Sequence, residues 1–290
     1  MTMILDAFRD SLVDTIKLVP FLFLTYLAME ILERRAGDHS SLLLTKVGPF
    51  SPLVGALVGV IPQCGFSAAA ASLYSGGLIS LGALLAVFLS TSDEMIPIFI
   101  SEQVPLSQLL RIILAKALLG AVSGLAVDLF IRLRHLATGE KHIRDLCERE
   151  HAGLEEEEGS AVRAALIHTA HITLFVFLIS LILSFLVEGV GQATLHDLLS
   201  EHASAGVLVC TLIGLIPNCA ASVLLTQFYL EGILSAGQMM SGLLVGAGVG
   251  LLVLFRTNRH LKENLSITFL LWCVGVFWGI ILEHTGLLGL

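Results

Sequence analysis

The sequence has very little charge for its length. Of its 290 residues only 14% are Asp, Glu, Lys or Arg, whereas 56% are hydrophobic and the mean hydropathy is +0.89. A soluble domain of this size needs a charged shell, so this composition excludes an ordinary water-soluble protein and favours lipid as the solvent. Six apolar runs approach or reach the ~20 residues that cross a bilayer. They are residues 18–32, 78–100, 112–131, 172–187, 239–255 and 267–282.

Several motifs are also absent, and each absence removes a class of function. There is no P-loop, so the chain does not use ATP directly, and no basic patch for nucleic acid. It has no HExxH or GxSxG sequence, which leaves an enzyme without a metal motif or a nucleophile. The five cysteines form no CxxC pair, so a disulfide framework is not expected. We therefore expect no catalysis, no permanently bound cofactor and no nucleic-acid partner.

An internal duplication is the clearest pattern in the chain. The segment 57–64, LVGVIPQC, matches 212–219, LIGLIPNC, at an offset of 155 residues. The same offset pairs Tyr74 with Tyr229 and Asp128 with Glu283. A shared apolar bias would not reproduce Pro-x-Cys, Tyr and an acidic residue at one fixed spacing. The sequence therefore predicts two membrane repeats, 1–131 and 161–290, joined by a charged linker at 132–160.

Charge placement predicts how the repeats are oriented. Lys and Arg cluster in 34–46, 132–163 and 256–262, whereas 101–108 and 188–205 contain neither. By the positive-inside rule the basic segments are cytoplasmic, and the regions between them make odd numbers of crossings. The two repeats, each of about five helical segments, are then inverted. Both termini lie outside and the central linker lies in the cytoplasm.

Pro62 and Pro217 explain the odd number of crossings. Each proline has only about a dozen apolar residues on either side, and proline breaks a helix. Half-length helices, re-entrant or fully crossing, would meet at these breaks near the middle of the membrane. Inverted repeats with broken helices are typical of secondary transporters, whose substrate sites lie at the breaks. The predicted substrate-binding residues are Pro62, Gln63, Cys64, Pro217, Asn218 and Cys219.

Ionisable residues inside the apolar runs are the second group of candidates. Charge within a membrane is costly and usually functional. Asp93 and Glu94 lie inside the run 78–100, where the second repeat has Gly248 and Val249. Near the start of each repeat, Asp14 and Lys17 correspond to His168 and His171. We expect Asp14, His168, His171 and Asp93 to take part in proton coupling. Glu30 and Asp128 are weaker candidates of the same kind.

The central linker is the third candidate. His142, Cys147 and His151 lie there among many Glu residues, but their spacing matches no closed zinc site. A solvated charged helix is the simpler interpretation.

The segments 59–64, 92–94 and 214–219, together with the duplicated halves and the hydrophilic linker, resemble a known family. These are the ten-helix heavy-metal exporters of bacteria, variously labelled arsenic efflux protein or manganese transporter. The resemblance covers essentially the whole chain. It implies a multi-pass permease in the bacterial cytoplasmic (inner) membrane, and it leaves the transported ion open.

Ligand chemistry frames the choice of ion. The sulfurs of Cys64 and Cys219 favour arsenite-like metalloids, Zn²⁺ or Cd²⁺, whereas the oxygens of Asp93, Glu94 and Asn218 favour Mn²⁺. These five residues are the predicted metal ligands. The leading hypothesis is a secondary exporter of a metal or metalloid ion, with the lipid bilayer and the ion as partners and a homodimer left open. The alternatives are a permease for a small organic or anionic solute, and a membrane sensor or assembly protein.

Overall fold

The computed structural model describes residues 50–61, 64–92, 95–134 and 203–286, with scattered positions within 12–27 and 162–181. Throughout these ranges the regular elements are all helices. The first-repeat helices are α3 (Ser51–Gly59), α4 (Cys64–Ser75), α5 (Leu81–Ser90), α6 (Met95–Ser101) and α7 (Leu106–Leu133). The second-repeat helices are α11 (Ala203–Gly214), α12 (Cys219–Leu230), α13 (Ala236–Val245), α14 (Val249–Thr257) and α15 (Leu261–Thr285).

The helix boundaries repeat at the offset found in the sequence. Adding 155 to both ends of α4 and α5 gives both ends of α12 and α13, and α7 and α15 begin at the same relative position. Helices α5 and α13 also begin in the same way: Ser80 and Ser235 are their N-caps, and each side chain accepts a backbone hydrogen bond from three residues further on. The two halves therefore share one secondary structure as well as one sequence pattern.

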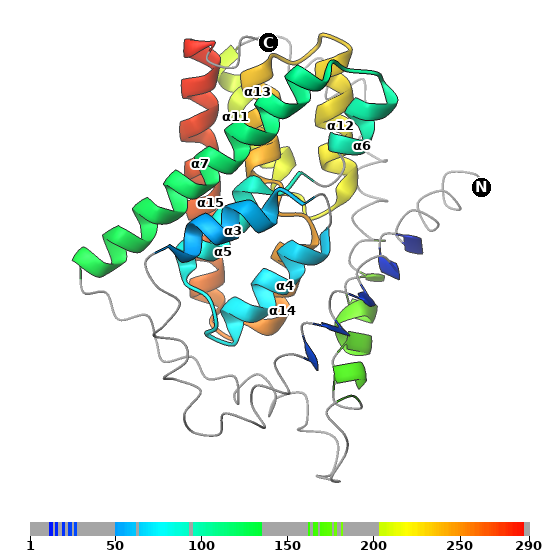
Figure 1. The fold of residues 1–290 in the computed structure, drawn as a ribbon, viewed down its shortest axis with the longest axis vertical. Coiled ribbons are helices and arrows are strands. Elements are labelled where there is room, and N and C mark those ends of the chain that lie inside the picture. Colours follow the sequence, from blue (N-terminus) through cyan, green and yellow to red (C-terminus); the bar gives the residue numbers. More distant parts are fainter. Residues whose placement is uncertain are drawn as a thin grey trace.

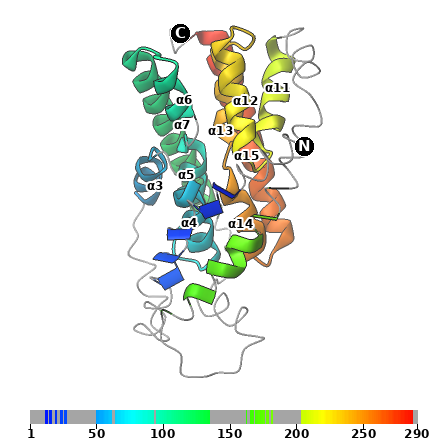
Figure 2. The same cartoon turned by 90° about the vertical axis from the view of Figure 1, so that its right-hand side faces the viewer.

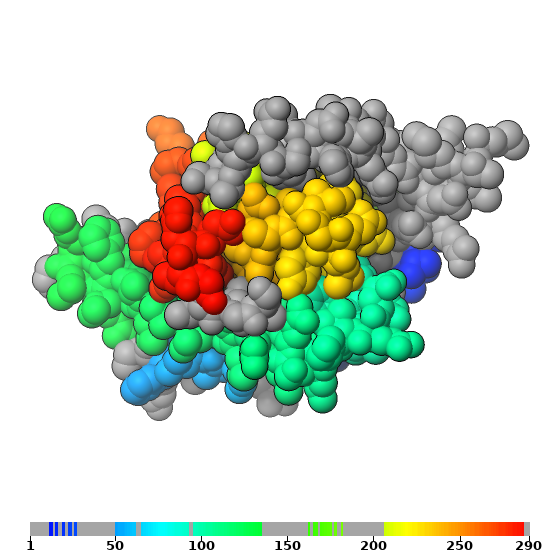
Figure 3. Space-filling model, turned by 90° about the horizontal axis from the view of Figure 1, so that it is seen from above, coloured from blue at the N-terminus to red at the C-terminus, as the bar shows by residue number. Residues whose placement is uncertain are grey.

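Helices α5 and α13 form the centre of the molecule. Their core side chains include equivalent positions of the two repeats, Leu84 with Met239 and Phe88 with Leu243, all at most 3% exposed. The long helices α7 and α15 pack on the outside of this pair and run in opposite directions along the long axis (Figure 1). Helices α4 and α14 lie together at the lower end, and α6 and α12 at the upper end, in both side views (Figure 2). From above, the end of α15 and the α12–α13 and α6–α7 corners lie side by side (Figure 3).

The outer faces of α7 and α15 are apolar. On α7, Leu106, Leu110, Leu114, Leu118 and Val122 follow one another at intervals of four and are all at least 45% exposed. The second repeat exposes Leu261, Leu265, Phe269 and Phe277 at equivalent positions. An exposed apolar stripe of this length on a long helix suits contact with lipid. By length and composition, four stretches are apolar enough to cross a bilayer: 106–133, 236–257 and 261–285 among the described residues, and 81–101, which includes two residues outside them.

Side-chain contacts between the repeats are reciprocal. Tyr74 of α4 donates a hydrogen bond to Glu263 at the start of α15. Tyr229 of α12 accepts one from Gln108 at the start of α7, at 2.8 Å, and these are the equivalent positions with the repeats exchanged. Such an exchange is the mark of a two-fold relation. Ser123 and Trp278, themselves 155 residues apart, are hydrogen-bonded at 2.8 Å, which places them beside the pseudo-two-fold axis.

The helix breaks lie where proline predicts them, and each repeat has a second one. The chain leaves the helix between Gly59 and Cys64 and between Gly214 and Cys219. It also leaves the helix after Ser90 and after Val245, inside the apolar runs 78–100 and 239–255. In the second repeat the turn needs Gly248, whose φ of 52° lies in the left-handed region that favours glycine. Each repeat thus supplies two interrupted helices.

Candidate functional site

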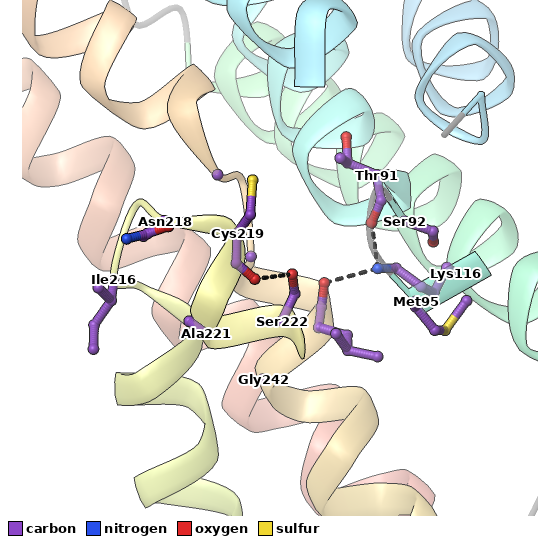
Figure 4. Close-up of a pocket in the computed structure, with 14 residues that line it drawn as sticks. Thr91, Ser92, Met95, Lys116, Ile216, Asn218, Cys219, Ala221, Ser222 and Gly242 are labelled. Atoms are coloured by element: carbon purple, nitrogen blue, oxygen red, sulfur yellow. Dashed lines mark hydrogen bonds between the residues drawn. The ribbon is translucent and has the colours of Figure 1, made fainter. Parts of the chain in front are cut away.

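A small cavity lies where three of these breaks converge. Its volume is about 20 Å³, close to the space that one water molecule or one dehydrated ion occupies. The lining comes from the α5–α6 break, the α11–α12 break, the α13–α14 break and the middle of α7 (Figure 4). Its described side chains are mostly polar or small: Thr91, Ser92, Lys116, Asn218, Cys219 and Ser222, with glycines at 214, 242, 246 and 248.

The second Pro-x-Cys segment forms one wall. Asn218 is 9% exposed and is the N-cap of α12, its Oδ1 accepting a hydrogen bond from the Ala220 N–H at 3.2 Å. Cys219, a free cysteine, is the first residue of this helix. The Ser222 hydroxyl donates to the Cys219 carbonyl at 2.8 Å (Figure 4). Asn218, Cys219 and the first turn of α12 therefore form this wall of the cavity.

Close backbone packing fixes the opposite wall. A Cβ on Gly214 would lie 2.1 Å from the carbonyl oxygen of Gly242, so only glycine allows α11 to end so close to α13. Helix α13 then ends at Val245, and Gly246 and Gly248 line the cavity. Because the last turn of a helix leaves its carbonyl groups without intrahelical partners, this wall presents backbone oxygens.

Lys116 is a site residue that the sequence reasoning missed. It lies in the middle of α7, is 1% exposed, and extends its ammonium group between two interrupted helices. The ammonium donates to the carbonyl oxygen of Thr91, the C-cap of α5, and to that of Leu243 in the last turn of α13, the latter at 2.8 Å (Figure 4). The rule that charge inside an apolar run marks function would have found it in the run 112–131.

The structure places only part of the predicted substrate site. Asn218 and Cys219 line the cavity, and Pro217 lies in the same break. The backbone of Cys64 begins α4, but its side chain lies outside the described residues, as do Pro62 and Gln63. The ligand roles of all six stay predictions.

The predicted ionisable residues are placed even less completely. Asp93, Glu94, Asp14, Lys17 and His168 lie outside the described residues, as do Glu30 and the linker residues His142, Cys147 and His151. His171 is exposed on a described helical stretch and does not line the cavity. Within the described part of the chain, no three His, Cys, Asp or Glu residues are grouped as a metal site.

Asp128, a weaker candidate from the sequence, caps a central helix. This carboxylate is 7% exposed and accepts hydrogen bonds from the Ser80 hydroxyl at 2.6 Å and the Gly82 N–H at 2.8 Å. It therefore caps the N-terminus of α5, where an anion is favoured by the helix dipole. Its counterpart Glu283 accepts from Ser235 at the start of α13. Both side chains join the first turn of a central helix to the outer helix beside it.

Comparison with known proteins identifies the family. No curated protein and no solved structure matches the chain. A family described as "Putative, 10TM heavy-metal exporter" matches residues 1–157, which are the first repeat and nearly all of the linker. The match covers more than half of the 290 residues and is consistent with the apolar, membrane-length stretches. The chain therefore belongs to this ten-helix heavy-metal exporter family.

Proposed function

We propose that this protein is a secondary transporter that exports a heavy-metal or metalloid ion, Mn²⁺ or arsenite, across the bacterial cytoplasmic membrane. The family supports the class, and the apolar stretches support the location. The cavity supports the mechanism, because it lies where interrupted helices of both repeats meet, the usual place for a transported ion. The small volume suits an ion without its water shell.

The two repeats are inverted across the membrane in this proposal. The opposite courses of α7 and α15 and the reciprocal tyrosine contacts support the inversion. Arg132 in the last turn of α7 and Arg256 in the last turn of α14 belong to elements that end toward the lower part of Figure 1. The positive-inside rule makes that end cytoplasmic, with both termini outside and the interrupted helices meeting near the midplane.

The observation that carries the proposal is the presence of Asn218 and Cys219 in the cavity lining. A thiol sulfur suits arsenite or a soft cation, and an amide oxygen suits Mn²⁺. Cys64 and Gln63, together with Asp93 and Glu94, complete the proposed ligand set. Proton exchange through Asp14, Asp93, His168 and His171 is the proposed driving force.

Accumulation of Mn²⁺ and arsenite in inside-out membrane vesicles tests this function. We expect Cys219→Ser to lower arsenite uptake at least about tenfold if sulfur binds the ion, and Asn218→Ala or Asp93→Asn to lower Mn²⁺ uptake by a similar factor. Cys273→Ser is the matched control, because this free cysteine lies on α15 and does not line the cavity. Absence of uptake of both ions by the unmodified protein would overturn the proposal, and uptake that ignores the pH gradient would remove proton coupling.

A second candidate is a permease for a small anion, which one observation favours. Lys116 is the charged side chain among the described lining residues, and α12 presents its N-terminus to the same cavity. Both features attract negative charge. Competition separates the two candidates: excess Mn²⁺ would inhibit uptake by a cation exporter, whereas excess inorganic phosphate would inhibit an anion permease.

A further inference from the structure

Lys116 occupies an unusual position between the two central helices. Its ammonium group binds the carbonyl oxygens of Thr91 and Leu243, which belong to the C-terminal ends of α5 and α13. These two helices are equivalent in the two repeats and pack against each other near the pseudo-two-fold axis. One side chain from a third helix therefore joins the ends of both central half-helices.

The C-terminal end of a helix is a binding site for positive charge. Its last carbonyl groups lack intrahelical partners, and the helix dipole places partial negative charge there. Two such ends brought together inside a membrane favour a cation between them, because lipid offers no water to solvate them. Transporters with interrupted helices commonly bind a coupling cation at this location, through unwound carbonyls and half-helix C-termini.

We propose that the ammonium group of Lys116 is a tethered cation that fills the position of a bound coupling cation between α5 and α13. The proposal builds on the transport function above but concerns what holds the central helices together. It assigns to the ammonium a role in joining the two helices, in addition to its place in the cavity lining. A variant without this group is expected to gain a binding site for a small free monovalent cation.

The duplication provides an internal comparison for this role. The position equivalent to Lys116 is Leu271, which is fully buried on α15. The carbonyls equivalent to those of Thr91 and Leu243 are at Gly246 and Phe88, again on α13 and α5. The single ammonium of Lys116 thus joins α5 and α13, and the chain tolerates an apolar side chain at the equivalent position, Leu271.

Thermal unfolding of the purified full-length protein in detergent tests the proposal. We expect Lys116→Ala to lower the apparent Tm by at least ~5 °C in N-methylglucamine chloride, whose cation is too large to enter. Replacing that salt with ammonium, potassium or sodium chloride at equal ionic strength is expected to restore at least ~3 °C. The unmodified protein and Leu271→Ala, which removes a buried side chain without removing a charge, are expected to show no such preference. An equal Tm for Lys116→Ala in all four salts would overturn the proposal.

A charge exchange covers the case in which Lys116→Ala does not fold. In that case Lys116→Leu is expected to give aggregated protein as well, and Lys116→Leu combined with Leu271→Lys is expected to restore a single monodisperse peak on size exclusion. Failure of the exchange to restore folding would count against a tethered cation. Because these measurements involve no transport, a failure of metal export would overturn the proposed function and leave this result standing.

Discussion

The two repeats differ little in their frame and sharply in their charge. Both have interrupted helices with matching boundaries, a serine N-cap tied to an acidic residue, and an apolar outer stripe. In contrast, the position equivalent to Lys116 in the second repeat is Leu271, and the position equivalent to Glu263 in the first repeat is Gln108. Duplication therefore accounts for the scaffold, while charges present in only one copy lie where the copies meet. We expect substitutions in the shared scaffold to lower stability in both repeats. Substitutions of residues that are charged in only one repeat should have different effects in the two repeats.

The largest expected effect is on the packing of α5 against α7. A Cβ on Gly82 would lie 2.2 Å from the carbonyl oxygen of Gly124, a backbone atom that cannot move aside. Gly82→Ala is therefore expected to lower the free energy of unfolding by about 3 kcal/mol or more, measured by thermal unfolding in detergent. Gly237→Ala, the same change in the second repeat, is expected to cost somewhat less, because its nearest backbone atoms, N and Cα of Glu283, would lie 2.7 Å from the new Cβ.

A control for this prediction is Gly246→Ala. Its Cβ would meet its nearest neighbours at 3.5 Å, an ordinary contact, and we expect little change in unfolding. An equal loss for Gly246→Ala and Gly82→Ala would contradict the steric explanation.

The next effect in size concerns the acidic caps. Asp128→Ala removes a buried carboxylate with two hydrogen bonds, to Ser80 and Gly82, and is expected to cost about 2–3 kcal/mol. Glu283→Ala is expected to cost about 1–2 kcal/mol, because Glu283 is only half-buried and Gln238 also caps α13 by accepting a hydrogen bond from the Ser235 N–H at 3.0 Å. Apparent Tm values of the two variants, measured side by side, check the order. A larger loss for Glu283→Ala would show that the two caps are not ranked by burial.

The last comparison concerns the two tyrosines, and Tyr229→Phe has the smallest expected effect of all. Tyr74→Phe leaves the carboxylate of Glu263 without its hydroxyl donor, and is expected to cost about 1.5–3 kcal/mol. Tyr229→Phe removes a neutral hydrogen bond to Gln108 and is expected to cost about 0.5–1.5 kcal/mol. Glu263→Gln makes the partner of Tyr74 neutral, like the Gln108 partner of Tyr229. In that background Tyr74→Phe should therefore cost no more than Tyr229→Phe. A double-mutant cycle on unfolding measures both couplings.

These features could be predicted from the sequence to different degrees. The all-helical membrane fold, the duplication and the breaks beside Pro62 and Pro217 follow from local rules, since proline removes a backbone donor wherever it occurs. The second breaks were missed because Thr91-Ser92 and Gly246-Ala247-Gly248 lie in apolar runs, and only the packing of α13 decides that Gly248 turns rather than continues a helix. The sequence shows Lys116 as a lone charge within an apolar run but does not show which groups it contacts. Its burial depends on carbonyls of two helices remote from it in the chain.

The tyrosine contacts have a further consequence for any motion of one repeat against the other. The two hydrogen bonds lie at opposite ends of the molecule, because α4 ends at the lower end and α12 at the upper end. Parting the repeats at the lower end separates a hydroxyl from a carboxylate, and parting them at the upper end separates it from an amide. A difference of about 1.4 kcal/mol between these two costs corresponds to a tenfold difference between the populations of the two separated states. Because one position holds a glutamate and its equivalent a glutamine, loss of the hydrogen bond at the lower end is the costlier of the two.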